Sequence, residues 1–261
     1  MSGRIVLTAG HERARHVTAL AELLTRSSVP VAGVIMVRAI GRKRIRQVLR
    51  RQGFGALVAL ARQTVRGQAA SHGTDPLQEF LVSQDIRPAR VSDWARAHGV
   101  PVRRVADLNG PAALRQMKAW DPEVVIYGGG GILRESFLES ARWRVLNAHA
   151  GPLPAIRGMN AAEWAVLLGQ PREITVHFID RGIDTGAVVL RRALPPLAGA
   201  TVEQLRGLAV VTGIAAMVDV VLSGQWRHGG LTPTGPLSRQ CYALAPVMRE
   251  LLALRLARAR A

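Results

Sequence analysis

Three polar residues near the middle of the chain have side chains suited to acyl transfer. Asn147 and His149 are two positions apart, and Asp184 follows in a glycine-containing segment. Alternate residues of an extended chain face the same side, so the side chains of Asn147 and His149 share a face if this segment is a strand. Gly151–Pro154 then ends the strand, because proline cannot join the hydrogen-bond ladder. We therefore expect the pair at a strand end, where open α/β sheets place their sites.

The three residue types match the requirements of acyl transfer to an amine. An attacking ammonium group must lose a proton near neutral pH, and the pKa of histidine suits that step. The amide of Asn147 can hold an oxyanion, and the carboxylate of Asp184 can orient the imidazole of His149. No serine or cysteine adjoins His149, which favours direct transfer over a covalent acyl-enzyme. By residue types alone, an Asn-x-His pair is more often structural than catalytic.

Strand and helix patterns alternate along the chain. They predict an α/β fold with a Rossmann-like open, mostly parallel sheet and helices on both faces. The expected strands are residues 4–8, 31–37, 100–105 and 124–127, and the expected helices are residues 12–27, 91–99, 111–120 and 201–224, with a last helix from about Pro246. We expect a catalytic domain at residues 1–200 with a basic helical insertion at about 41–75, and a short C-terminal helical extension at 201–261.

Four consecutive glycines, Gly128–Gly131, follow the fourth expected strand. They lack the spacing of a phosphate loop. Bare backbone would let a flat ligand lie close, because no Cβ holds it off. A tight strand-to-helix turn explains the same residues, so both interpretations stay open.

The net charge is +17, from 35 Lys and Arg against 18 Asp and Glu, and only Lys43 and Lys118 are lysines. No acidic residue occurs between Leu23 and Thr74, where ten Arg or Lys stand. This segment is interpreted as a solvated helix pair, a wall facing a phosphorylated substrate, or a surface for anionic lipid. A nucleic-acid partner is disfavoured, because Phe54 is the one aromatic residue there and no stacking platform results. Residues 67–76 are expected to form a loop.

The cysteine count and the apolar stretches limit which cellular compartment and which cofactors we expect. The single cysteine, Cys241, excludes an intramolecular disulfide and a zinc site built from cysteines, and we expect no metal. The apolar stretch Gly207–Val218 falls short of the roughly 20 residues that span a bilayer. We find no signal peptide and expect a cytoplasmic protein without a transmembrane segment. The oligomeric state stays open, a homodimer included.

The central segment resembles the signature of the folate-dependent formyltransferases. The matching features are Asn147-Ala-His149, Leu153-Pro154, Arg157-Gly158, Gly169, Thr175-Val-His177 and Asp184-Thr-Gly186. The likeness extends more loosely over about residues 4–200. In this family the peptide bond at the position of Leu153-Pro154 is often cis.

The resemblance implies a role for each matching residue. Asn147 would bind the formyl oxygen, and His149 would accept the amine proton or stabilise the oxyanion. Asp184 would pair with His149 and pass protons through water to the departing nitrogen. The donor would be 10-formyltetrahydrofolate, bound by Gly130, Gly131, Ile132, Leu133, Ile179, Asp180 and Ile183. His177 would stand behind the site, unless it is an ordinary strand histidine.

Departures from the family pattern indicate a branch. Ala150-Gly151-Pro152 follows His149 where many members have Pro-Ser, and Ala9–Arg13 does not match the phosphate loop of the purine-pathway branch. The 37 residues after Gly224 are too few for the C-terminal domain of the initiator-tRNA branch, and the N-terminal part lacks the regulatory domain of the hydrolase branch. We therefore expect formyl transfer to the primary amine of a small, anionic acceptor such as a nucleotide-linked amino sugar. The alternatives are an amino acid, peptide or natural-product amine as acceptor, a basic nucleic-acid-binding protein, or a catalytically silent folate-binding protein.

Overall fold

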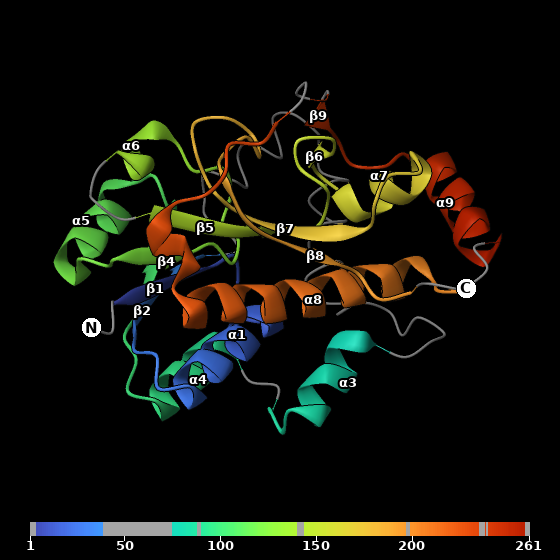
Figure 1. The fold of residues 1–261 in the computed structure, drawn as a ribbon. Coiled ribbons are helices and arrows are strands. Elements are labelled where there is room, and N and C mark those ends of the chain that lie inside the picture. Colours follow the sequence, from blue (N-terminus) through green and yellow to red (C-terminus); the bar gives the residue numbers. More distant parts are fainter. Residues whose placement is uncertain are drawn as a thin grey trace, which may run out of the picture.

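A seven-stranded sheet organises the part of the chain that the structure describes. This computed structural model describes residues 4–38, 75–87, 90–139, 144–196, 199–234, 238 and 240–258. The strand order is β3-β2-β1-β4-β5-β7-β8 (Figure 1). The strands are β1 Ile5–Ala9, β2 Val31–Val37, β3 Val102–Val105, β4 Val124–Ile126, β5 Arg144–His149, β7 Glu173–Phe178 and β8 Val188–Ala193. The pairs from β3 to β5 are parallel, whereas β7 pairs antiparallel with both β5 and β8, so the prediction of a mostly parallel sheet is confirmed.

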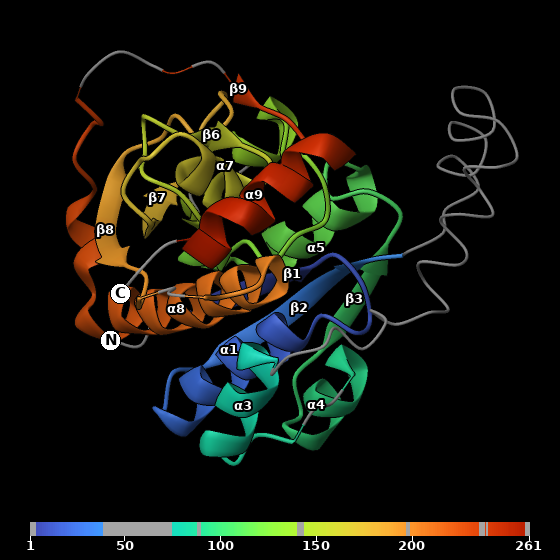
Figure 2. The ribbon, with the colours of Figure 1, turned by 90° about the vertical axis from the view of Figure 1, so that its right-hand side faces the viewer.

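Helices cover both faces of the sheet, as expected. They are α1 Arg15–Arg26, α3 Pro76–Ser83, α4 Val91–Ala97, α5 Pro111–Trp120, α6 Glu135–Leu138, α7 Ala161–Leu167, α8 Val202–Ser223 and α9 Pro246–Arg258, with a 3₁₀ turn at Gln225–His228. On one face α1, α4 and α8 pack their buried side chains against Leu7, Val34 and Leu146 (Figures 1 and 2). On the other face α5 and α6 bury Met117 and Phe137 against the sheet.

The helix α8 has the boundaries that the sequence predicts. The Thr201 side chain accepts from the backbone of Gln204 and the Gln204 side chain accepts from the backbone of Thr201, which is a capping box. Gly224 ends the helix with φ +70°. By length and composition alone α8 is long and apolar enough to cross a membrane. The predicted apolar stretch, Gly207–Val218, was therefore too short. Half of its most hydrophobic window is buried inside the fold, where the helix packs on β7 and α1.

Two predictions about the regions flanking residue 75 have different outcomes. The basic insertion at about 41–75 lies almost wholly outside the described residues. The loop expected at 67–76 is wrong at its end, because Pro76 begins α3. Asp75 accepts hydrogen bonds from the backbone of Leu77 and Gln78, and Pro76 stands at the first helical position. An N-cap aspartate followed by proline predicts the start of a helix, so the sequence contained this signal.

The chain after α8 packs against the segment that follows β5 in the sequence. β9 (Gln240–Cys241) pairs in parallel with β6 (Arg157–Gly158), and α9 packs against α7. These elements lie together on one side of the main sheet in Figure 1. The domain boundary at residue 200 stays a prediction, and α8, directly after it, packs on the same sheet.

Candidate active site

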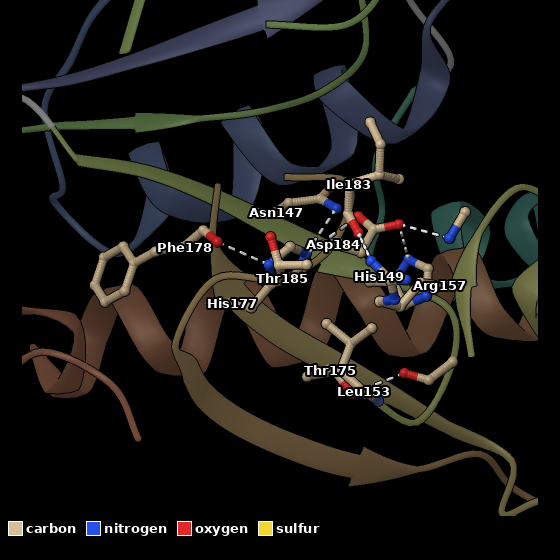
Figure 3. Close-up of polar contacts among 12 residues, drawn as sticks. Asn147, His149, Leu153, Arg157, Thr175, His177, Phe178, Ile183, Asp184 and Thr185 are labelled. Atoms are coloured by element: carbon tan, nitrogen blue, oxygen red, sulfur yellow. Dashed lines mark hydrogen bonds and ion pairs between the residues drawn. The ribbon is translucent and has the colours of Figure 1, made fainter. Parts of the chain in front are cut away.

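The end of β5 brings the predicted catalytic side chains together. Antiparallel pairing of β5 with β7 sets Asn147 opposite His177 and His149 opposite Thr175. The loop after β7, residues 179–187, then folds back and carries Asp184 to the two histidines (Figure 3). Asn147, His149 and Asp184 therefore meet at one place, as the sequence predicts, and their catalytic roles remain proposals.

His149 is held by a backbone carbonyl on one side and faces a carboxylate on the other. Its Nε2 lies 2.9 Å from the carbonyl oxygen of Ile156, and its Nδ1 lies 3.5 Å from Asp184 Oδ2. Because a carbonyl oxygen can only accept, Nε2 carries the hydrogen, and Nδ1 of the neutral ring has a free lone pair. Burial lowers the pKa of His149, and the Asp184 carboxylate partly offsets this effect. The ring is thus neutral but lies beside a group that stabilises its charged form.

His177 orients the amide of Asn147. His177 Nδ1 lies 2.8 Å from the Phe178 carbonyl oxygen, so it donates there, and Nε2 accepts from Asn147 Nδ2 at 3.2 Å. The ring is 1% exposed, and burial together with the nearby His149 lowers its pKa to about 4, with Asp184 acting in the opposite direction. His177 is therefore neutral at physiological pH and fixes one N–H of the amide, which leaves the second N–H for a ligand.

Asp184 adopts an uncommon backbone conformation. Its φ of +52° lies in the left-handed region, which few residues other than glycine occupy. Its Oδ2 accepts a 2.8 Å hydrogen bond from the backbone N–H of Gly158, and its Oδ1 lies 3.6 Å from His177 Nε2. The carboxylate thus contacts both histidines and the backbone of β6.

The glycine loop between β4 and α6 packs closely against the end of β1. A Cβ on Gly128 would lie 2.3 Å from the carbonyl oxygen of Thr8, so this position requires glycine. The Thr8 hydroxyl donates to the Gly129 carbonyl at 2.9 Å, and His16 Nε2 contacts the Gly128 carbonyl at 3.1 Å. A close strand-to-helix turn accounts for Gly128, and this local packing does not decide whether a ligand also lies against the loop.

The predicted donor-binding residues occupy two loops beside the site. Gly130 and Gly131 have φ of +129° and +101°; Ile132 is 71% exposed, whereas the side chain of Leu133 is buried. In the 179–187 loop, the Ile179 N–H donates to the Val145 carbonyl, the Asp180 carboxylate accepts from Thr185, and the Ile183 carbonyl accepts from Arg157. No ligand contact follows from these bonds, so donor binding by the seven residues remains a proposal.

A pocket of about 360 Å³ opens between α6 and the 179–187 loop. It is lined by Leu138, Arg144, Val145, Phe178, Ile179, Ala187, Gly229 and Gly230. Val145 and Asn147 face the same side of β5, and at about 3.3 Å per residue their Cα atoms are roughly 7 Å apart. The pocket therefore reaches the residue two positions before Asn147 on the same face of β5.

Sequence reasoning gave no role to several residues that the structure places at the site. Arg157 contacts the 179–187 loop, and the Tyr127 hydroxyl donates to the Gly131 carbonyl at 2.8 Å. His16 meets Gly128 over a separation of 112 residues, which no local spacing could indicate. The peptide bond between Leu153 and Pro154 is cis. Among the described residues, no group of three His, Cys, Asp or Glu is arranged to hold a metal ion.

Comparison with known proteins identifies the family. The formyl transferase family matches residues 57–221, and the chain belongs to this family, as its sequence signature predicts. A methionyl-tRNA formyltransferase of Trichlorobacter lovleyi is 28% identical over 170 residues, which are 64% of this chain and 52% of that protein. The chain thus spans about half the length of the curated relatives it matches.

Solved structures share the fold at lower sequence identity. Glycinamide ribonucleotide transformylase 1 from Symbiobacterium toebii superposes with a TM-score of 0.58 at 21% identity, covering 90% of this chain and 94% of that one. A sugar N-formyltransferase from Shewanella sp. superposes with a TM-score of 0.57 at 9% identity, covering 98% and 88%. These likenesses confirm the Rossmann-like fold expected from the sequence.

Proposed function

We propose that the protein transfers a formyl group from 10-formyltetrahydrofolate to the primary amine of a small acceptor. The observation that carries this proposal is the meeting of the Asn147 amide, the His149 imidazole and the Asp184 carboxylate at the end of β5. Membership of the formyl transferase family supports the same reaction class.

We propose a step in this reaction for each side chain, and the distances between them support it. The amine nitrogen attacks the formyl carbon, a C–N bond to the acceptor forms, and the bond to the donor nitrogen breaks. The second N–H of Asn147 donates to the oxyanion that develops. His149 Nδ1 takes up the proton lost by the attacking ammonium, and Asp184, 3.5 Å away, stabilises the imidazolium. That proton then goes to the departing nitrogen of the donor, and the second proton that the acceptor nitrogen loses on becoming an amide is released to solvent.

The donor fits beside this trio. The pocket at Val145 is mostly apolar, and its volume of about 360 Å³ suits the flat ring of a folate. We propose that the ring lies there, between α6 and the 179–187 loop. Of the seven residues expected to bind the donor, Ile179 lines this pocket. We propose that the other six contact parts of the donor outside it.

The acceptor we propose is a small anionic amine such as a nucleotide-linked amino sugar. The excess of positive charge supports an anionic acceptor. The matched relatives are methionyl-tRNA formyltransferases, so an aminoacyl-tRNA is the second candidate. A cytoplasmic location would supply the folate and either acceptor.

Mass spectrometry tests both the reaction and the acceptor. The purified protein is incubated with 10-formyltetrahydrofolate and a panel of nucleotide-linked amino sugars, amino acids and methionyl-tRNA, and the gain of one formyl group is measured. Asn147→Ala should lower the rate by about 10²–10³-fold and His149→Ala by about 10²–10⁴-fold. His98→Ala is the matched control and should keep the wild-type rate, because His98 lies directly after α4, away from the site, and contacts the Trp94 carbonyl. Full activity in either site variant, or release of formate without any amine, would contradict the proposal.

A further inference from the structure

One guanidinium group joins two segments that are far apart in the sequence. Arg157 Nη1 donates to the Ile183 carbonyl at 3.1 Å, and Figure 3 labels both residues. Its Nε donates to the Ser238 carbonyl at 3.2 Å, with Nη2 on the same oxygen. None of the ion pairs among the described residues involves Arg157. The side-chain hydrogen bonds that Arg157 makes to described residues thus all go to backbone carbonyls, and its part there is to cross-link two loops rather than to neutralise a carboxylate.

The carbonyl that Arg157 holds directly precedes the catalytic carboxylate. Asp184 has φ of +52°, and an uncommon backbone conformation at a functional site persists only where its surroundings fix it. Arg157 fixes Ile183, while the next residue, Gly158, donates its N–H to Asp184 Oδ2 at 2.8 Å. Two consecutive residues of β6 thus hold both the backbone and the side chain of the 183–184 pair.

The C-terminal part of the chain holds β6 in turn. Gly158 pairs with Cys241 in β9 and has φ of +97°, and a Cβ there would lie 2.2 Å from the Cys241 carbonyl oxygen. The Met159 N–H also donates to that oxygen at 3.0 Å, and the Ser238 N–H donates to the Pro154 carbonyl at 3.4 Å. The backbone around Arg157 is therefore held by β9 at Gly158 and Met159, and Ser238, which accepts from Arg157, is itself hydrogen-bonded to Pro154.

We propose that Arg157 is a positioning residue, which keeps Asp184 against His149 by tying the 179–187 loop to the segment at Ser238. This inference rests on the proposed function. The geometry gives the reason: without the guanidinium, the Ile183 carbonyl loses its partner and the loop can move, so the distance from Asp184 Oδ2 to His149 Nδ1 is no longer set. A shift of about 1 Å in a reacting group can cost about 10²-fold in rate.

A kinetic double-mutant cycle tests this role. Arg157→Met should lower kcat by about 10–10²-fold and leave KM for donor and amine within about threefold, since only Asp184 is displaced. Arg157→Lys, which keeps a donor, should recover part of the loss. In an Asp184→Asn background the same Arg157→Met change should cost less than about threefold, because the residue through which Arg157 acts is already lost. Arg4→Met is the control: Arg4 Nε also donates to a backbone carbonyl, that of Asp121, and Nη2 pairs with the Asp121 carboxylate. Arg4 directly precedes β1 and Asp121 lies shortly before β4, at the strand ends opposite the site.

A measurement without substrate separates this inference from the proposed function. Hydrogen exchange of the Gly158 amide reports whether the Asp184 carboxylate is held, and it should become at least about tenfold faster in Arg157→Met and stay unchanged in Arg4→Met. If the wild type formylates no amine, the proposed function fails, and the exchange result still decides the position of Asp184. Wild-type kcat, equal losses in both backgrounds, or unchanged Gly158 protection would overturn the inference. Should thermal melting show that Arg157→Met does not fold, Arg157→Lys is taken through the same cycle and judged by the same outcomes.

Discussion

Replacing His177 with glutamine should change how the stability of the fold depends on pH. The ring of His177 is 1% exposed, and burial with the neighbouring His149 lowers its pKa from 6.5 to about 4. A glutamine oxygen can accept the same N–H from Asn147 and does not titrate. The variant therefore isolates the protonation of this one side chain.

The sign and the size of the change in the free energy of unfolding follow from the two pKa values of residue 177, in the folded and in the unfolded chain. Between pH 6.5 and about 4 the unfolded chain takes up a proton at residue 177 that the folded chain does not, so the wild type loses stability as the pH falls through this window. Above pH 6.5 both states are neutral there and the contribution is constant. For these two pKa values the loss between pH 7 and pH 4.5 is about 2 kcal/mol. The His177→Gln variant lacks this loss.

Urea unfolding at pH 7, 6, 5 and 4.5, followed by tryptophan fluorescence, measures the difference. We expect the curve of free energy of unfolding against pH to be flatter in His177→Gln than in the wild type by about 2 kcal/mol over this range. If the two proteins lose stability in parallel, His177 is not buried as a neutral ring, and the orientation of the Asn147 amide has to be explained differently.

Three further substitutions test the scaffold around the site, each by thermal or urea unfolding. Gly128→Ala should lower the free energy of unfolding by about 1–3 kcal/mol, because its Cβ would lie 2.3 Å from the Thr8 carbonyl oxygen; a wild-type melting temperature would show that the loop adjusts freely. Thr201→Ala should cost about 1 kcal/mol by removing the capping box of α8, and a serine at the same position should restore most of it. Glu163→Ala should cost about 1–3 kcal/mol, because the buried carboxylate accepts from Arg206 at 2.7 Å; no change in stability would mean that this pair contributes nothing net.

Local sequence signals predicted most of the scaffold. The apolar run after Pro30 gives β2 with the expected ends, Val31 and Val37, and Thr201 and Gly224 bound α8 as their cap chemistry requires. Where a signal was present but not used, the prediction failed: Asp75 followed by Pro76 marks the start of α3. Helix caps and apolar strands can be predicted from the sequence because each depends on residues only a few positions apart.

Contacts between distant segments could not be predicted in the same way. Asn147 and His149 were predicted from their alternation in one strand, and Asp184 as a carboxylate in a glycine-containing segment, which the family signature also contains. The tautomers of the two histidines depend on carbonyls of Ile156 and Phe178, and so on the path of the folded backbone. The two-residue pairing of β6 with β9 leaves no periodic pattern at all, since a strand of this length has no alternation to detect.

The contacts of Arg157 with Ser238 and of Gly158 with Cys241 determine when, during synthesis of the chain, the site can be completed. A ribosome makes the chain from the N-terminus, so Asn147, His149 and Asp184 leave it well before Ser238 does. The main sheet can form around them, while the carbonyl that receives Arg157 and the strand that pairs with β6 have not yet been made. The contacts that hold Ile183 and Gly158 beside Asp184 can therefore form only late in the synthesis of the chain, after most of the main sheet has been made.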